Sequence, residues 1–270
     1  MRDHEVLPHQ VLDSCESTQI LAKELVRQGY SHGHWISSRV QEKGRGRFGR
    51  EWKSEAGNLF LSLILKVEDR SLWSWVPLTV SVAVADCVRK NFSQVPLQIK
   101  WPNDLWIHSM KIGGVLCESI TQGSESYLIA GIGFNLAHAP RLLHVDQSSL
   151  LQGLKSVSVP SSAVMAQSTC LKDHTLSGDD LSLDLFRSNV VDSVLQFIDE
   201  LNQKGHFQIQ ARYQQWSALP VGTRIAWGDS SQKRGRVIGL GKFSELRVQT
   251  EEGQIDSLFS EDVSVRPTEI

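Results

Sequence analysis

The segment 44–50, which reads GRGRFGR, carries the residues best suited to chemistry. Arg45, Arg47 and Arg50 each offer a guanidinium group that can form paired hydrogen bonds with a carboxylate or a phosphate. The interspersed glycines permit backbone conformations that other residues avoid, and they leave backbone N–H groups accessible. This pattern predicts an anion-binding loop. Taken alone, the same residues fit an RNA-binding loop or a solvated basic loop equally well.

A second group of candidate residues lies in the strings KWPND and KIGG. Pro102 favours a turn, so Asn103 and Asp104 are expected at the tip of one strand pair, near the point where Lys111 begins the next strand. A cation, an amide and a carboxylate would then converge. In isolation, ordinary turn residues and an exposed lysine at a strand end explain this segment equally well.

Together the two groups meet the needs of one reaction, in which a carboxylate attacks the α-phosphate of ATP. This attack brings like charges together, so the site must supply positive charge and hold the reacting oxygens in line. Arg45, Arg47 and Lys111 can supply that charge. The glycines would let the backbone close over the mixed anhydride and exclude water.

Four motifs, GRGRFGREW, KWPND, KIGGVL and GIGFNL, resemble in order and spacing the catalytic domain of biotin–protein ligases over roughly residues 14–136. The resemblance implies an α+β fold, with a mixed, largely antiparallel sheet flanked by helices in a class II synthetase-like catalytic domain, plus a small C-terminal SH3-like β-barrel. It implies biotin and ATP with Mg2+ as substrates, and a biotin carboxyl carrier protein domain as the partner that receives biotin on a lysine.

The resemblance also assigns roles to single residues. It implies a biotin site formed by Ser17, Thr18, Gln19, Gln41, Arg45, Gly46, Arg47, Lys111 and Gly114. It implies an ATP site formed by Arg47, Arg50, Trp52, Asn103, Asp104, Lys111, Asn135 and Arg266. Lys111 and Arg45 would be catalytic, Trp52 would stack on the adenine, and Asp104 would lie near the metal or the acceptor lysine. Gln19 stands where many relatives have asparagine, and no residue is assigned as a dedicated metal ligand.

Two other functions stay open. Lipoate– or octanoate–protein ligases share the fold, and charge spacing does not reveal which acid a pocket prefers. A non-catalytic RNA-binding module would use the arginine-rich loop and the terminal barrel. The formal net charge of −2 argues against this module, which also leaves the KIGG string unexplained.

Hydrophobic periodicity indicates the elements that must position these residues in the first half of the chain. A short helix is expected at 17–27, because Ile20, Leu21 and Leu25 recur at helical spacing before Gly29. Strands are expected at 34–40, 58–67, 97–101, 104–108, 111–120 and 127–136, the last four joined as hairpins, and a buried helix is expected within 73–92.

The second half is less regular at first. Residues 139–180 predict only irregular structure with some helix. A long helix is expected within 181–205, with Leu185, Val190, Val194, Ile198 and Leu201 on one face, and a short helix at 206–216. Beyond Pro220, short strand-like pieces separated by Gly, Asp and Ser indicate a small barrel. We therefore expect a catalytic domain at 1–219 and a small β-barrel domain at 220–270.

Composition narrows the setting. Hydrophobic residues make up 40% and charged residues 21% of the chain, close to ordinary globular usage, and no segment approaches a membrane span. The four cysteines are scattered singly, so we expect reduced thiols in a cytoplasmic protein. Only 16 residues precede Ser17, too few for the winged-helix domain with which some relatives bind DNA, so no DNA binding is expected. The sequence leaves open whether the chain forms a homodimer.

Overall fold

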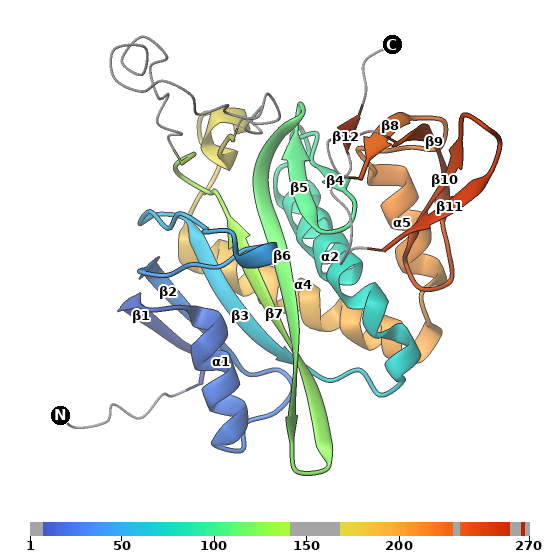
Figure 1. Ribbon diagram of the computed structural model, residues 1–270. Helices are drawn as coiled ribbons and strands as arrows, with labels where there is room; N and C mark the ends of the chain where they lie inside the picture. Colours follow the sequence, from blue (N-terminus) through green and yellow to red (C-terminus); the bar gives the residue numbers. More distant parts are fainter. Residues whose placement is uncertain (1–7, 141–167, 229–232, 260–265, 268–270) are drawn as a thin grey trace, which may run out of the picture.

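The computed structural model describes residues 8–140, 168–228, 233–259 and 266–267. A seven-stranded sheet forms its centre, in the order β1-β2-β3-β7-β6-β5-β4 (Figure 1). Its strands are β1 (Gln10–Cys15), β2 (Trp35–Gln41), β3 (Leu59–Leu65), β4 (Gln98–Lys100), β5 (Asp104–Ile107), β6 (Met110–Gln122) and β7 (Glu125–Phe134). Only β1 and β2 pair in parallel, and every other neighbouring pair is antiparallel. The predicted mixed, largely antiparallel sheet is confirmed.

Helices cover both faces of this sheet (Figure 1). Helix α1 (Thr18–Arg27) buries one side against Ile36, Ile64 and Ile129. Helices α2 (Val76–Asn91) and α4 (Leu183–Lys204) pack on the opposite face, and α5 (Phe207–Trp216) follows them. Because both faces are covered, every residue of β3 is buried, which explains its almost continuous apolar sequence.

Most of the expected elements are confirmed, with two differences. Strand β1 was not expected, because its sequence QVLDSC is half polar and it lies at the sheet edge, where a strand need not be apolar. In α4 the expected Leu185 is not on the buried face, since its side chain is 48% exposed. Phe186 and Arg187, respectively four and three positions before Val190, occupy that face instead. The other four residues expected on this face are buried.

Within the region 139–180, residues 141–167 lie outside the described residues. The described remainder contains a short 3-10 helix, Leu171–His174. Among the described residues, the helical stretch Arg70–Asn91 is long and apolar enough to cross a membrane by composition, but 67% of its most apolar window is buried inside the molecule.

A five-stranded antiparallel sheet forms the C-terminal part, in the order β11-β10-β9-β8-β12. Its strands are β8 (Arg224–Trp227), β9 (Lys233–Leu240), β10 (Leu246–Thr250), β11 (Ile255–Leu258) and β12 (Arg266–Pro267). The expected small C-terminal barrel-like sheet is thus confirmed. Its buried residues, including Trp227 and Val237, belong to the same apolar cluster as α2 and α4. The expected boundary at 219/220 therefore stays a prediction.

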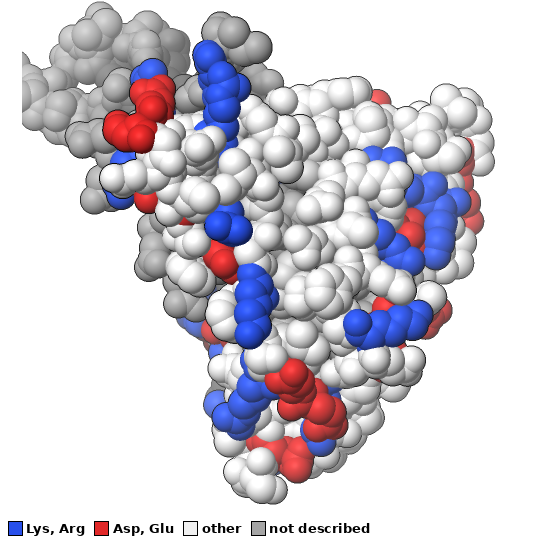
Figure 2. Space-filling view, turned by 90° about the vertical axis from the view of Figure 1, so that its right-hand side faces the viewer, with Lys and Arg blue, Asp and Glu red and all other residues white. Residues whose placement is uncertain are grey.

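Charged side chains are mixed in sign on the surface that faces right in Figure 1. Figure 2 shows Lys and Arg there in several separate groups, with Asp and Glu between them. This face therefore presents no continuous basic surface of the kind that nucleic acids favour.

Candidate active site

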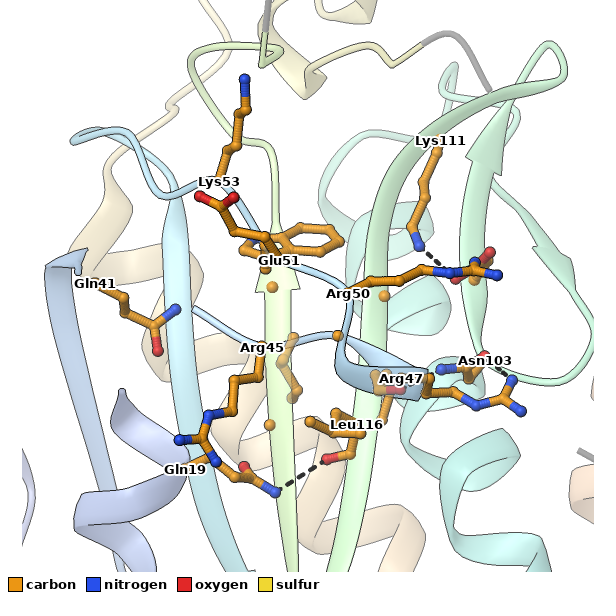
Figure 3. A pocket seen from close by; sticks show the side chains of 18 of the residues that line it. Gln19, Gln41, Arg45, Arg47, Arg50, Glu51, Lys53, Asn103, Lys111 and Leu116 are labelled. Atoms are coloured by element: carbon orange, nitrogen blue, oxygen red, sulfur yellow. Dashed lines mark hydrogen bonds and ion pairs between the residues drawn. The ribbon is translucent and has the colours of Figure 1, made fainter. Parts of the chain in front are cut away.

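A cavity of about 350 Å³ lies against the central sheet, beyond the N-terminus of α1. Ser62 of β3 and Gly131 of β7 line it. Each lies two residues along its strand from an isoleucine that packs with α1, Ile64 on β3 and Ile129 on β7. Because side chains alternate between the two faces of a strand, the cavity lies on the α1 side of the sheet. The arginine-rich loop crosses this face and closes one side of the cavity (Figure 3).

The structure brings nearly all the expected site residues together. Those that line the cavity are Ser17, Thr18, Gln19, Gln41, Arg45, Gly46, Arg47, Arg50, Trp52, Asn103, Asp104, Lys111, Gly114 and Asn135. Arg266 lies in β12, where its backbone pairs with Ala226 of the C-terminal sheet, and its role toward the nucleotide stays a prediction.

Lys111 and Asp104 form an ion pair at the cavity wall, with 2.6 Å between Nζ and Oδ1. The β5–β6 hairpin produces this contact, because Lys111 is the second residue of β6 and Asp104 begins β5 opposite Gly114. Both side chains remain partly exposed, at 30% and 27%. The expected convergence of the cation and the carboxylate is therefore confirmed, and the pair can still reach a ligand.

The arginines of the loop point in different directions (Figure 3). Arg47 Nη1 donates to Asn103 Oδ1 at 3.1 Å, and Asn103 Nδ2 in turn donates to the Val115 carbonyl. Arg45 extends toward Gln19 at the other end of the cavity (Figure 3). A short bridge between the backbones of Arg45 and Glu51 shapes the loop. Cationic groups thus flank the cavity on two sides rather than at a single point.

The indole of Trp52 lies flat on the sheet because Gly133 leaves room for it. A Cβ atom at Gly133 would stand 2.6 Å from the ring. Lys111 Nζ lies 5.3 Å from the centroid of the same ring. Trp52 Nε1 is buried, and within the described part of the chain it has no hydrogen-bond partner. The amide oxygen of Asn135 is likewise buried without a hydrogen-bond partner among the described residues. Both atoms can therefore bond a ligand that covers the indole.

The opposite end of the cavity is a buried polar network. Gln41 Oε1 accepts from the Thr18 backbone N–H at 2.9 Å, and Thr18 Oγ1 lies 2.9 Å from Ser62 Oγ. Ser62 Oγ donates to Gln19 Oε1 at 3.0 Å. The hydroxyl of Ser17 gives α1 no side-chain cap, and Gln41 instead bonds the first backbone N–H of the helix. These uncharged groups can recognise the polar head group of a ligand through hydrogen bonds.

A segment after the undescribed residues closes the cavity from above. Asn135 Nδ2 donates to the Thr169 carbonyl at 3.0 Å, and the Thr169 N–H donates to the Lys111 carbonyl at 3.0 Å. His174 Nε2 lies 2.8 Å from Thr169 Oγ1. Burial, reinforced by the neighbouring His108, lowers the pKa of His174 below its usual range. A neutral imidazole can accept the threonine hydroxyl, so His174 helps to hold this segment.

The sequence alone did not identify Ser62, Lys100, Gly131 and Gly133, which also line the cavity. The two glycines carried a signal, because a glycine inside a strand marks the close approach of another group. Ser62 carried none, since a serine in an apolar strand is unremarkable by itself. Among the residues that the structure describes, no cluster of three or more His, Cys, Asp and Glu side chains could hold a metal ion.

Comparisons with known proteins agree with this geometry. Residues 11–135 match the model of the biotin/lipoate A/B protein ligase family. Biotin--protein ligase 2 of Arabidopsis thaliana is 38% identical over 37% of this chain and 32% of its own. The biotin--[acetyl-CoA-carboxylase] ligase of Paracoccus denitrificans is 36% identical over 48% of this chain and 55% of its own. The matched part of this chain thus spans less than two thirds of either relative.

The fold has a close counterpart among solved structures. The biotin protein ligase from Aquifex aeolicus, solved in complex with biotin and ATP, superposes with a TM-score of 0.74 at 24% identity. The superposition covers 96% of this chain and 98% of the other, so both sheets take part in it. Residues 11–135, where the four motifs lie except for the final residue of GIGFNL, are thus similar to the biotin/lipoate A/B protein ligase family.

Proposed function

We propose that this protein is a biotin–protein ligase, which converts biotin and ATP to biotinyl-5'-AMP and transfers biotin to a lysine of a biotin carboxyl carrier protein domain. One observation carries the proposal: a single cavity joins a hydrogen-bonding end, at Thr18 and Gln41, to an end that holds Lys111 and Arg47. Biotin has the matching design, with a polar ureido ring at one end and a carboxylate at the other.

In the first half-reaction a carboxylate oxygen of biotin forms a bond to the α-phosphorus of ATP. The bond from that phosphorus to the bridging oxygen breaks, and pyrophosphate leaves. Negative charge gathers on the phosphorus oxygens, and fixed cations lower the energy of that state. Lys111 is the proposed principal cation, and Arg45 and Arg47 hold the carboxylate and phosphate from either side.

The nucleotide is proposed to bind over Trp52. The adenine would stack on the indole, and the unpartnered amide oxygen of Asn135 would accept a hydrogen bond from the base. Arg50 and Asn103 line the same part of the cavity. Glu51 and Asp104 are the acidic side chains among the described lining residues. Mg2+ would therefore enter as MgATP, held mainly by phosphate oxygens and water, which is its usual coordination at nucleotide sites.

In the second half-reaction the lysine amine of the carrier domain attacks the acyl carbon of biotinyl-5'-AMP. An amide bond forms, the bond from the acyl carbon to the phosphate oxygen breaks, AMP leaves and the amine loses a proton. Asp104 is proposed to lie at this junction, near the metal-bound phosphates or the acceptor amine. The loop and the segment that includes Ser168 would shield the adenylate from water until the acceptor arrives.

Biotin-dependent exchange of labelled pyrophosphate into ATP tests the first half-reaction. The wild-type protein should catalyse exchange only when biotin is present, and a carrier domain should then gain the mass of one biotinyl group. Absence of exchange with folded protein would overturn the proposal.

The same assay separates the alternatives. Biotin and lipoate are offered together and singly, and exchange that responds to lipoate alone would assign the lipoate reaction instead. RNA binding that weakens with salt, without any response to ATP, would favour the non-catalytic module. The cytoplasmic location and the division at 219/220 rest on the sequence and stay predictions, and the sequence leaves open whether the chain forms a homodimer.

A further inference from the structure

Two side-chain amides, those of Gln41 and Gln19, stand at the ends of the polar network in the inner part of the cavity, and hydrogen bonds fix the orientation of each. Gln41 Oε1 accepts from the Thr18 backbone N–H at 2.9 Å, while Gln41 Nε2 donates to Ser54 Oγ at 3.3 Å. The oxygen of the Gln41 amide, not its nitrogen, therefore faces Thr18. At the other end Gln19 Nε2 donates to the Ile129 carbonyl at 3.0 Å, so its oxygen faces Ser62.

Between these two amide oxygens stand the hydroxyl groups of Thr18 and Ser62. Three contacts link the four oxygens: Thr18 to Gln41 at 3.2 Å, Thr18 to Ser62 at 2.9 Å and Ser62 to Gln19 at 3.0 Å. Each hydroxyl has a single hydrogen to donate, and an amide oxygen has none. Two hydrogens cannot fill three contacts, so one contact is always without a hydrogen.

The missing hydrogen falls on the contact that faces the ligand. Gln19 Oε1 is buried and has Ser62 as its hydroxyl donor, so leaving it without that hydrogen is costly. Ser62 then donates to Gln19 and accepts from Thr18. The Thr18 hydroxyl can donate to Gln41 or to Ser62, and because Ser62 Oγ is nearer, 2.9 Å against 3.2 Å, the Thr18–Gln41 contact is the one left without a hydroxyl hydrogen. Both residues line the cavity, so a donor on a bound ligand can supply what is missing.

The length of the Gln19 side chain makes this arrangement possible. Its amide crosses to the sheet over Gly131, where an added Cβ would stand only 2.6 Å from Gln19 Oε1. The missing side chain at Gly131 thus admits the longer arm, which reaches Ser62 and the Ile129 carbonyl together. A shorter asparagine at this position would have to give up one of these contacts.

We propose that Gln19 and Ser62 are positioning residues that hold the Thr18 hydrogen away from Gln41, so that the Thr18–Gln41 pair selects acids whose ring carries an N–H donor. This inference rests on the proposed function and deepens it. Biotin has such a donor in its ureido ring, whereas lipoate, an acid of similar length, has none. If Ser62 or the Gln19 amide is removed, the Thr18 hydroxyl is free to donate its hydrogen to Gln41, so the ligand donor is no longer needed there.

The test measures discrimination rather than activity. Isothermal titration gives the affinity of the intact protein for biotin and for its two monomethylated ureido isomers, each of which lacks one N–H donor. Wild-type protein should bind at least one isomer much more weakly than biotin. In Ser62→Ala and in Gln19→Leu the ratio of the affinity for biotin to the affinity for that isomer should fall by about tenfold, which corresponds to one hydrogen bond to a buried acceptor.

Ser37→Ala is the matched control. Ser37 is also a buried strand serine, and its hydroxyl donates to the Phe60 carbonyl at 2.8 Å, but it does not line the cavity. This variant should keep the wild-type ratio of affinities for biotin and the methylated isomer. An unchanged ratio in both Ser62→Ala and Gln19→Leu, with thermal unfolding showing folded protein, would overturn the inference. If wild-type protein binds no biotin at all, the proposed function itself fails, and the two failures are therefore distinguishable.

Discussion

At the scale of single residues, the ion pair between Lys111 and Asp104 is the feature most directly tied to the proposed chemistry. Its 2.6 Å contact holds the ammonium group at the cavity wall, and partial exposure leaves it able to approach a phosphate. A cation placed in this way before the substrate arrives needs little reorganisation when charge develops, which is what makes preorganised charges effective.

Lys111→Ala should lower the rate of biotin-dependent pyrophosphate exchange by about 10²–10³-fold, the usual loss when one preorganised group that stabilises developing charge is removed. Biotin affinity should change much less, because the charge is needed mainly in the transition state. Titration and exchange assays measure the two effects. Lys90→Ala is the matched control, since it breaks an equally short Lys–Asp contact, 2.6 Å to Asp86, on α2. Exchange in Lys111→Ala at the level of the control would contradict the role.

Motif residues were predictable from the sequence because their types state their chemistry. Lys111 and Asp104 were expected to meet, and they do. Ser62 could not have been predicted in the same way. Its importance arises from the register of β3 against β7 and from the reach of Gln19, and these depend on pairings between distant parts of the chain. The divergence of Arg45 and Arg47 likewise depends on the fold of the loop.

At the scale of elements, β7 contributes a flat surface rather than functional groups. Gly133 lies in the middle of the sheet, and its missing side chain lets the Trp52 indole rest on the strand. The glycine pattern of GIGF is therefore a requirement of the loop that packs on it, as much as of the strand itself.

Gly133→Ala should raise the KM for ATP by about tenfold or more, since the new methyl group displaces an indole whose stacking on a base is worth that much. The KM for biotin should stay close to wild type. Gly113→Ala provides the contrast, because Gly113 does not line the cavity and its Cβ would meet the Gly133 carbonyl and the Phe134 ring, both 2.9 Å away. That variant should lower the melting temperature without a selective effect on ATP. Equal effects on both KM values in Gly133→Ala would refute the assignment.

The segment held by His174 predicts a dependence of stability on pH. Burial lowers the pKa of His174, so the unfolded chain binds the proton more readily than the folded one. The stabilising contribution is therefore complete above about pH 6.5, the usual histidine value, and is lost as the pH falls below it. Urea unfolding between pH 7.5 and 5.5 should show a smaller decline in His174→Gln than in wild type. Parallel declines would show that His174 does not contribute.

Hydrophobic patterning gave the elements where the pattern was strong, and it failed where the environment decided. The valine-rich helix α2 was predictable because its length is excessive for a strand. Strand β1 was not, because an edge strand that pairs in parallel with β2 needs no continuous apolar face. Leu185 was misplaced because an apolar residue in the first turn of a helix can point to solvent.

At the scale of the whole molecule, the two sheets meet next to the cavity. Trp75 Nε1 donates to the Lys242 carbonyl at 2.8 Å, and Trp101 Nε1 donates to the Ser244 carbonyl at 2.9 Å. Ser244 Oγ in turn donates to the Ser74 carbonyl. The turn between β9 and β10 is thus bonded to the central part of the chain by side chains from both sides.

The two tryptophans differ in one respect that allows a test. Trp101 lines the cavity and directly precedes Pro102 and Asn103, whereas Trp75 is buried away from it. Trp101→Phe and Trp75→Phe each remove one hydrogen bond to the same turn while keeping an aromatic ring, so each should lower the free energy of unfolding by about 1 kcal/mol.

Only Trp101→Phe should also raise the KM for ATP, because the Ser244 carbonyl would no longer fix the position of the turn that carries Asn103 and Asp104. Urea unfolding and exchange kinetics on both variants measure the two effects separately. If both variants lose stability and neither changes the KM, the C-terminal sheet only stabilises the fold. If the KM changes in Trp101→Phe alone, the C-terminal sheet helps to position the nucleotide site through this one indole, although its own strands carry none of the loop residues that surround the cavity.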